Sequence, residues 1–169
     1  MSMRRGHIGR RRIIAVMLAG SLLSGALAGC TMLMPQTGQA EQTEGSTVDY
    51  GDVANAVTAA VPRVVGVRDL AQSANGLGHR LSLGLEVDTA EPLTADELDA
   101  VVEAIWGALP WEPNTIKITA GADTAEGHEI VDLRTAAADL DPLGVTNAGT
   151  GGVSLTDMSA RYGKWSAPE

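Results

Sequence analysis

Few side chains in this 169-residue sequence are suited to chemistry, which directs attention to one cysteine and two of the three histidines. Cys30 is the sole thiol, so it could be a nucleophile or be alkylated, but it cannot form a disulfide within the chain. His79 and His128 follow the first thirty residues, and two imidazoles alone do not complete a metal site. The carboxylate pairs in 139–141 and 123–126 offer too few oxygen ligands for calcium. We therefore expect no bound metal and no cofactor.

The sequence patterns associated with catalysis are also incomplete. Ser154 lacks the following glycine that a nucleophile elbow requires, because Leu155 comes next. The glycine-rich run at 149–152 follows no predicted strand and lacks the lysine of a phosphate-binding loop. With 21 acidic residues in the chain, carboxylate pairs are expected by chance. Such pairs therefore do not by themselves indicate an acid–base catalyst. We expect a protein that is not an enzyme and has no catalytic residues.

The first thirty residues have the order of an export signal. An apolar run from Ile13 to Leu23 and a group of small residues follow five arginines, namely Arg4, Arg5, Arg10, Arg11 and Arg12. The basic end of such a segment stays in the cytoplasm, so the chain after it faces outward. The sequence therefore predicts an extracytoplasmic protein.

The stretch Leu27-Ala28-Gly29-Cys30 ends this segment and closely resembles the lipobox of bacterial lipoproteins. The resemblance implies that residues 1–29 are a signal peptide that is cut away. It also implies that Cys30 receives diacylglycerol and becomes the mature N-terminus, held on the extracytoplasmic face of the cell membrane by acyl chains such as palmitate. Two or more chains anchor a protein stably, since each buried methylene contributes about 0.8 kcal/mol. The polar residues up to position 47 would form a flexible tether.

Two alternatives for the N-terminal segment stay open. Residues 13–34 could form an uncleaved membrane helix, because 22 residues are enough to span roughly 30 Å of hydrocarbon. The run Arg10-Arg11-Arg12 could also belong to a twin-arginine export signal. All of these interpretations place the rest of the chain outside the cytoplasm.

The charge of the chain is strongly asymmetric. Without the five N-terminal arginines, seven basic residues stand against 21 acidic ones. A surface this acidic repels nucleic acid and anionic headgroups, and it favours solubility, cationic ligands or divalent ions. We therefore expect no nucleic-acid partner.

Periodicity gives two clear elements of secondary structure. Leucine and valine alternate with polar residues or glycine from Arg80 to Asp88, which predicts a strand with one buried face. A helical stripe runs from about Ala95 to Leu109, and Thr94 and Glu97 form a capping-box pattern at its start. The acidic residues opposite this stripe indicate a solvated side.

Weaker patterns complete an α+β domain at 48–142. We predict a helix at 48–61 and strands at 63–71, 115–120 and 128–134. The order helix, strand, strand thus occurs twice, which suggests duplicated αββ units. We expect these units to form one four-stranded antiparallel sheet with both helices on one face. A turn-rich connector at 142–152 and a short helix at 154–162 would belong to a C-terminal tail, 143–169, that packs on the domain.

These features favour a binding or scaffolding module for another component of the cell envelope, most directly a protein. The partner surface would use the polar side of the sheet and an exposed tryptophan, through Arg80, Glu86, Asp88, Lys117 and Trp111. The alternative is a small lipoprotein that binds a solute or a cation for a transporter. Calorimetry with calcium and small cations distinguishes the two functions.

Overall fold

The computed structural model describes residues 47–169. The signal peptide, the lipobox at 27–30 with Cys30, and the tether up to residue 46 lie outside the described residues, so the expectations placed on them stay predictions. Among the described residues, no helix has the length and apolarity that a membrane crossing requires.

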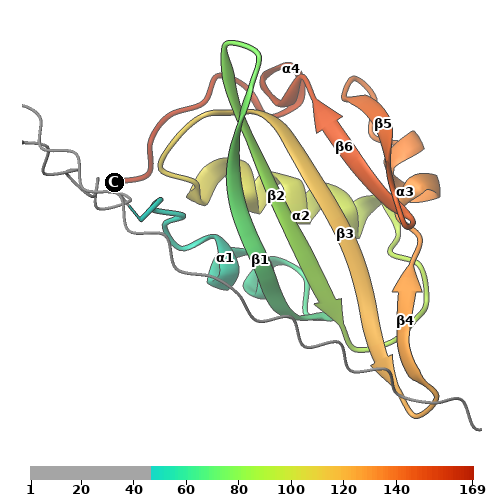
Figure 1. The fold of residues 1–169 in the computed structure, drawn as a ribbon. Coiled ribbons are helices and arrows are strands. Elements are labelled where there is room, and N and C mark those ends of the chain that lie inside the picture. Colours follow the sequence, from blue (N-terminus) through green and yellow to red (C-terminus); the bar gives the residue numbers. More distant parts are fainter. Residues whose placement is uncertain (1–46) are drawn as a thin grey trace, which may run out of the picture. The chain divides into compact units, whose positions relative to one another are not determined.

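The described residues form a mixed α+β domain of four helices and six strands (Figure 1). The predicted α+β class is therefore confirmed. In chain order the elements are α1 (Val53–Ala60), β1 (Val64–Asn75), β2 (Gly78–Val87), α2 (Ala95–Ala108), β3 (Pro113–Thr124), β4 (Gly127–Val131), α3 (Arg134–Ala138), β5 (Gly144–Gly149), β6 (Gly152–Thr156) and α4 (Met158–Tyr162).

All six strands belong to one sheet with the order β1-β2-β3-β6-β5. One edge of β3 pairs with β2 over most of its length, and its other edge is shared between two strands. β6 pairs with residues 116–118 of β3, and β4 pairs with residues 120–124. β3 is therefore the central strand, with neighbours from both earlier and later parts of the chain.

The prediction of four antiparallel strands was wrong in two respects. β2 and β3 are parallel, because the crossover through α2 returns the chain to the end of the sheet where β2 began. The C-terminal region also adds β5 and β6 to the sheet, where we expected a connector at 142–152 and the start of a helix at 154.

Several boundaries also differ from the prediction. α1 begins at Val53 rather than at 48, since Gly51 has a φ of 56° that a right-handed helix does not allow. β1 extends to Asn75, so the hairpin to β2 has a two-residue turn instead of the longer loop expected. β4 ends at Val131, and the chain then enters α3.

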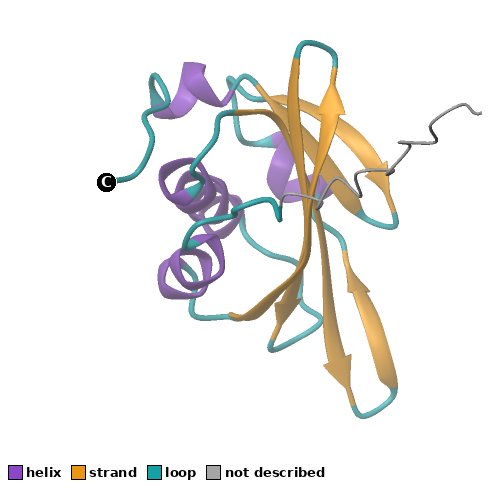
Figure 2. Cartoon of the chain, turned by 60° about the vertical axis from the view of Figure 1, so that its left-hand side comes forward, coloured by secondary structure: helices purple, strands orange, loops and turns teal. Residues whose placement is uncertain are grey.

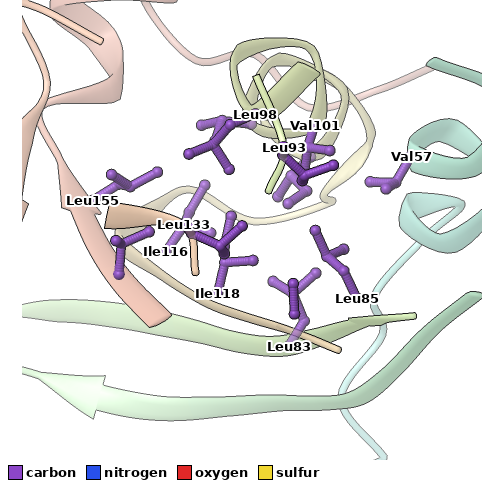
Figure 3. Packing of buried hydrophobic residues seen from close by; sticks show 14 of the residues in the cluster. Val57, Leu83, Leu85, Leu93, Leu98, Val101, Ile116, Ile118, Leu133 and Leu155 are labelled. Atoms are coloured by element: carbon purple, nitrogen blue, oxygen red, sulfur yellow. The ribbon is translucent and has the colours of Figure 1, made fainter. Parts of the chain in front are cut away.

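The hydrophobic core lies between the sheet and helices α1 and α2, which Figure 2 shows together on one side of the sheet. α2 has the predicted capping box: Glu97 N–H donates to Thr94 Oγ1, and the Glu97 carboxylate accepts from Thr94 N–H at 2.8 Å. Figure 3 shows buried side chains of the strands facing those of the two helices. Leu83, Leu85, Ile116, Ile118 and Leu155 come from the strands, and Val57, Leu98 and Val101 come from α1 and α2. This face of the sheet is therefore closed.

Candidate binding face

The opposite face of the sheet points away from α1 and α2, and we call it the open face. Strand register defines its members, because directly paired residues project on the same side. The pairs along β2 and β3 are Arg80 with Thr115, Ser82 with Lys117, Gly84 with Thr119, and Glu86 with Gly121. Ser154 of β6 pairs with Lys117 and extends the face. The open face is thus lined mainly by polar residues and glycine.

Three of the five residues predicted for the partner surface lie on this face. Arg80, Glu86 and Lys117 alternate with the buried leucines and isoleucines of β2 and β3. Glu86 lies 3.7 Å from Arg68 on the neighbouring strand, so its charge is balanced locally. Arg80 and Lys117 differ from it, because no carboxylate of the described residues forms an ion pair with either.

Most other basic residues of the described chain are in ion pairs, unlike Arg80 and Lys117. Of its seven basic residues, four are in ion pairs: Arg63 with Asp88 and Glu97, Arg68 with Glu86, Arg134 with Asp132, and Arg161 with Asp99. Lys164, in the C-terminal segment, is the third basic residue for which no such pair occurs in 47–169. Two of the three cations without an ion pair therefore lie on one sheet face, on neighbouring strands.

A polar network holds the Arg80 side chain. Its guanidinium donates from Nη2 to Asn75 Oδ1 at 3.0 Å, and Asn75 Nδ2 donates in turn to Thr115 Oγ1 at 2.8 Å. The amide of Asn114 donates to Asn75 O at 2.7 Å. Arg80 Nε is buried without a hydrogen-bond partner within the described part of the chain. The network fixes the side chain while leaving its charge unpaired.

Asp88 and Trp111, also predicted for the partner surface, have structural contacts elsewhere. Asp88 accepts from Arg63 Nε at 3.4 Å beside the start of α2. Trp111 is half-buried, and its Nε1 donates to Asp49 O at 2.9 Å. Its ring also meets His79 edge-on, with 6.0 Å between ring centroids. The Trp111 contact joins the segment before α1 to the loop before β3, whereas Asp88, directly after β2, is held by Arg63 between α1 and β1.

A hollow of about 550 Å³ lies on the same face, farther along the strands from Arg80. Gly84 and Gly121 contribute no side chain to its floor. The lining residues are Arg68, Asp69, Gly84, Leu85, Thr119, Ala120, Gly121, His128, Ile130 and Thr150. Sequence reasoning missed this hollow. The two positive-φ residues Asp69 and Thr150, which lie in the β1 bulge and the β5–β6 turn, could not be recognised without the fold.

His128 is the titratable ring of the hollow, and its orientation is set by Asp123. The two side chains are paired across β3 and β4, with 2.8 Å from Nδ1 to Asp123 Oδ1. The ring lies over Gly121, which leaves room for it because glycine has no side chain: a Cβ at that position would stand 2.5 Å from His128 Nε2. His79 takes the corresponding place in the β1–β2 hairpin, paired with Ala74, and its ring lies against Trp111.

The described residues contain no group of three or more histidine, cysteine, aspartate or glutamate side chains arranged to hold a metal ion. Asp123 and His128 are a pair, with no third ligand of these types beside them in residues 47–169. The arrangement is suited to hydrogen bonding and charge recognition. The chain matches no protein-family model, no curated protein and no solved structure.

Proposed function

We propose that this protein is a membrane-anchored extracytoplasmic lipoprotein and a non-enzymatic docking module for an acidic segment of another cell-envelope protein. The anchor would be the lipid on Cys30, and the docking surface would be the open face around Arg80 and Lys117. One observation carries the proposal: both cations lack an ion pair within residues 47–169, although acidic residues greatly outnumber basic ones there.

Charge complementarity supports an acidic partner. An unpaired cation on a surface is most strongly stabilised by an anion, and an arginine recognises a carboxylate through two parallel donors. Ser154 lies beside Lys117 through the strand register, and its hydroxyl could bind a further acceptor. A short acidic stretch of a protein fits this small cationic surface.

The surrounding charge argues against larger anionic partners. Nineteen acidic residues of the described chain would repel a nucleic acid or an anionic bilayer, whose charge extends well beyond two cations. A protein segment can present its carboxylates locally and keep the rest of its surface neutral or basic. Local complementarity of this kind mainly determines which partner binds.

The docking surface is tested with a synthetic peptide that carries four consecutive glutamates between neutral flanks. Lys117→Gln should weaken its binding about fivefold or more, since a close charge pair contributes on the order of 1 kcal/mol or more at a protein interface. Lys164→Gln removes the same charge elsewhere and should leave the affinity unchanged. If the two substitutions weakened binding equally, the effect would come from net charge alone, and a specific docking surface would be contradicted.

The anchor is tested separately by intact-mass analysis of the mature N-terminus. The protein from membranes should begin at Cys30 and carry acyl chains, and Cys30→Ala should release it or leave an uncleaved precursor. An unmodified chain that retains residues 1–29 would instead favour a membrane helix at 13–34. Turnover in a broad panel of hydrolase substrates, abolished by a point substitution, would contradict the non-enzymatic part of the proposal.

A further inference from the structure

The hollow on the open face differs in charge from the docking surface. Arg68, its one basic lining residue, is paired with Glu86. Asp69 lines the hollow without an ion pair among the described residues, and the carboxylate of Asp123 lies behind His128. Negative charge is therefore in excess here, whereas positive charge is in excess around Arg80 and Lys117.

The imidazole of His128 presents an acceptor in its neutral form. A carboxylate only accepts hydrogen bonds, so His128 Nδ1 must carry the hydrogen that it shares with Asp123 Oδ1. In a neutral ring the other nitrogen, Nε2, then has a free lone pair. This atom lies over Gly121, which is part of the floor of the hollow.

Two further oxygen groups add acceptors to the hollow. The hydroxyl of Thr119 donates toward Leu83 O at 3.5 Å, which leaves its own lone pairs available. The carboxylate of Asp69 stands in a bulge of β1, where its φ of 57° is the left-handed conformation. Bulges redirect a side chain relative to a regular strand, and residues in such conformations are frequent at binding sites. The hollow thus combines a carboxylate, an imidazole nitrogen and a hydroxyl as acceptors.

We propose that this hollow binds a primary ammonium group, which carries one positive charge and three hydrogen-bond donors. Asp69 would supply the charge partner, and His128 Nε2 and Thr119 Oγ1 would accept the remaining donors. The ammonium could belong to a free small amine or to a lysine side chain of a protein. This site uses none of the cations of the docking surface, so it stands or falls independently of the proposed function.

An organic ammonium fits these groups better than a metal ion does. The hollow has a volume of about 550 Å³, within the usual range of roughly 300–1,000 Å³ for small-molecule sites. A bare ion would leave most of this space empty, and the described residues contain no cluster of three metal-binding side chains. The methylene chain of an amine could lie against Ile130, which is 56% exposed.

The test uses the full-length chain, purified in detergent, and calorimetry with three probes. These are 1,4-diaminobutane, a neutral blocked pentapeptide with one central lysine, and the same peptide with that lysine acetylated. The first two carry the ammonium, whereas acetylation removes it at nearly constant size. Saturable binding of the diamine identifies a free amine as the source, and binding of the lysine peptide alone identifies a side chain.

Two substitutions alter the hollow without an evident cost to the fold. Asp69→Asn removes the charge, and asparagine tolerates the left-handed conformation. Gly84→Val fills the floor, because a Cβ at Gly84 would meet its nearest atom, Arg68 Cγ, at an ordinary 3.5 Å. Thr146→Val is the matched control, since Thr146 pairs with Ser154 on the same face but does not line the hollow.

Asp69→Asn should weaken binding of the ammonium probe about tenfold or more, as expected for a lost charge-assisted hydrogen bond. Gly84→Val should abolish binding, and Thr146→Val should leave it unchanged, with circular dichroism confirming that all three variants are folded. The proposal is overturned if neither ammonium probe binds, if the acetylated peptide binds equally well, or if folded Gly84→Val retains full affinity.

Discussion

Asp99 on α2 accepts two hydrogen bonds from Arg161 on α4, from Nε to Oδ1 and from Nη2 to Oδ2, each 2.7 Å long. The Tyr162 hydroxyl donates to the same carboxylate, and Arg161 also donates to Asp141 O. Both charged side chains are mostly buried, with 29% and 25% of their surface exposed. This carboxylate, which the sequence suggested was on a solvated helix face, therefore connects α4 to α2.

The first prediction concerns the stability of this connection. Asp99→Asn should lower the free energy of unfolding by about 1–2 kcal/mol, because it leaves the partly buried Arg161 without a counter-charge. Asp96→Asn removes an exposed carboxylate of the same helix and should change stability by less than about 0.5 kcal/mol. Urea denaturation followed by circular dichroism measures both, and equal losses would contradict a specific role for Asp99.

The second prediction concerns the stability of the protein at acidic pH. Hydrogen bonds from Arg161 hold the pKa of Asp99 below its ordinary value, although partial burial acts in the opposite direction. A carboxyl whose pKa is lower in the folded state adds stability above its unfolded-state pKa, about 4, and loses it as the pH falls through the folded-state value. The wild type should therefore lose more stability between pH 5 and pH 2 than Asp99→Asn does.

The acid titration needs a comparison of this kind, because a second carboxyl responds in the same range. Asp132 has a pKa lowered to about 2 by hydrogen bonds from Arg134. That pair is exposed to solvent and is present in both proteins, so it cancels in the difference between the wild type and Asp99→Asn. Parallel acid-unfolding curves would show that Asp99 does not contribute.

The third prediction concerns alkaline pH. Burial, together with the hydrogen bond to Asp99, raises the pKa of the Tyr162 hydroxyl above its ordinary value. A group with a raised folded-state pKa adds stability that is complete below its unfolded-state pKa, about 10, and that is lost as the pH rises toward the folded-state value. Tyr162→Phe should show a smaller loss of stability above pH 10 than the wild type. A phenolate absorbance titration should also lose its most alkaline step in this variant.

The fourth prediction compares two tryptophans. Trp111 Nε1 donates to Asp49 O, whereas Trp165 Nε1 is buried without a partner in the described residues. Trp111→Phe should destabilise the protein by about 1 kcal/mol through the lost hydrogen bond. Trp165→Phe removes an unpaired donor at similar size, so its effect should be near zero or stabilising. A larger loss for Trp165→Phe would contradict this assignment.

Local patterns were enough to predict some of the elements closely. The strand at Gly78–Val87 and the helix at Ala95–Ala108 both differ from the prediction by no more than about two residues at an end, as expected for boundaries. Each has a strong signal of its own, in strict alternation for β2 and in an apolar stripe with a capping box for α2. For these two elements the local sequence signals and the tertiary contacts favour the same secondary structure.

Other elements depend on distant partners. β5 and β6 contain glycine, and β5 also contains asparagine, residues that are depleted in strands. β6 becomes a strand by pairing with β3, and β5 becomes one by pairing with β6. The parallel pairing of β2 and β3 follows from the crossover through α2, which no local pattern records. Arg80, Glu86 and Lys117 could be assigned to one face from alternation alone, whereas Asp88 and Trp111 required knowledge of their contacts with Arg63 and Asp49.

The hollow could not have been predicted, because it is defined partly by side chains that are missing. Gly84 and Gly121 come from two strands, and only the register shows that they lie on the same face. His128 reaches this place from a third strand, through its pairing with residue 123. The sequence shows that these residues are present, but it does not show that they lie close together in space.

The central position of β3 has a consequence for the order in which the chain can fold. Residues 116–118 of β3 have their second neighbour in residues 153–155 of β6, nearly forty positions later. During synthesis, which proceeds from the N-terminus, β3 is complete long before β6. Part of one edge of this central strand therefore stays unpaired until almost the whole chain has been made. Unpaired edges recruit other strands, so a chain shortened before residue 153 should tend to aggregate. The last strand completes the sheet and also protects it from association with other copies.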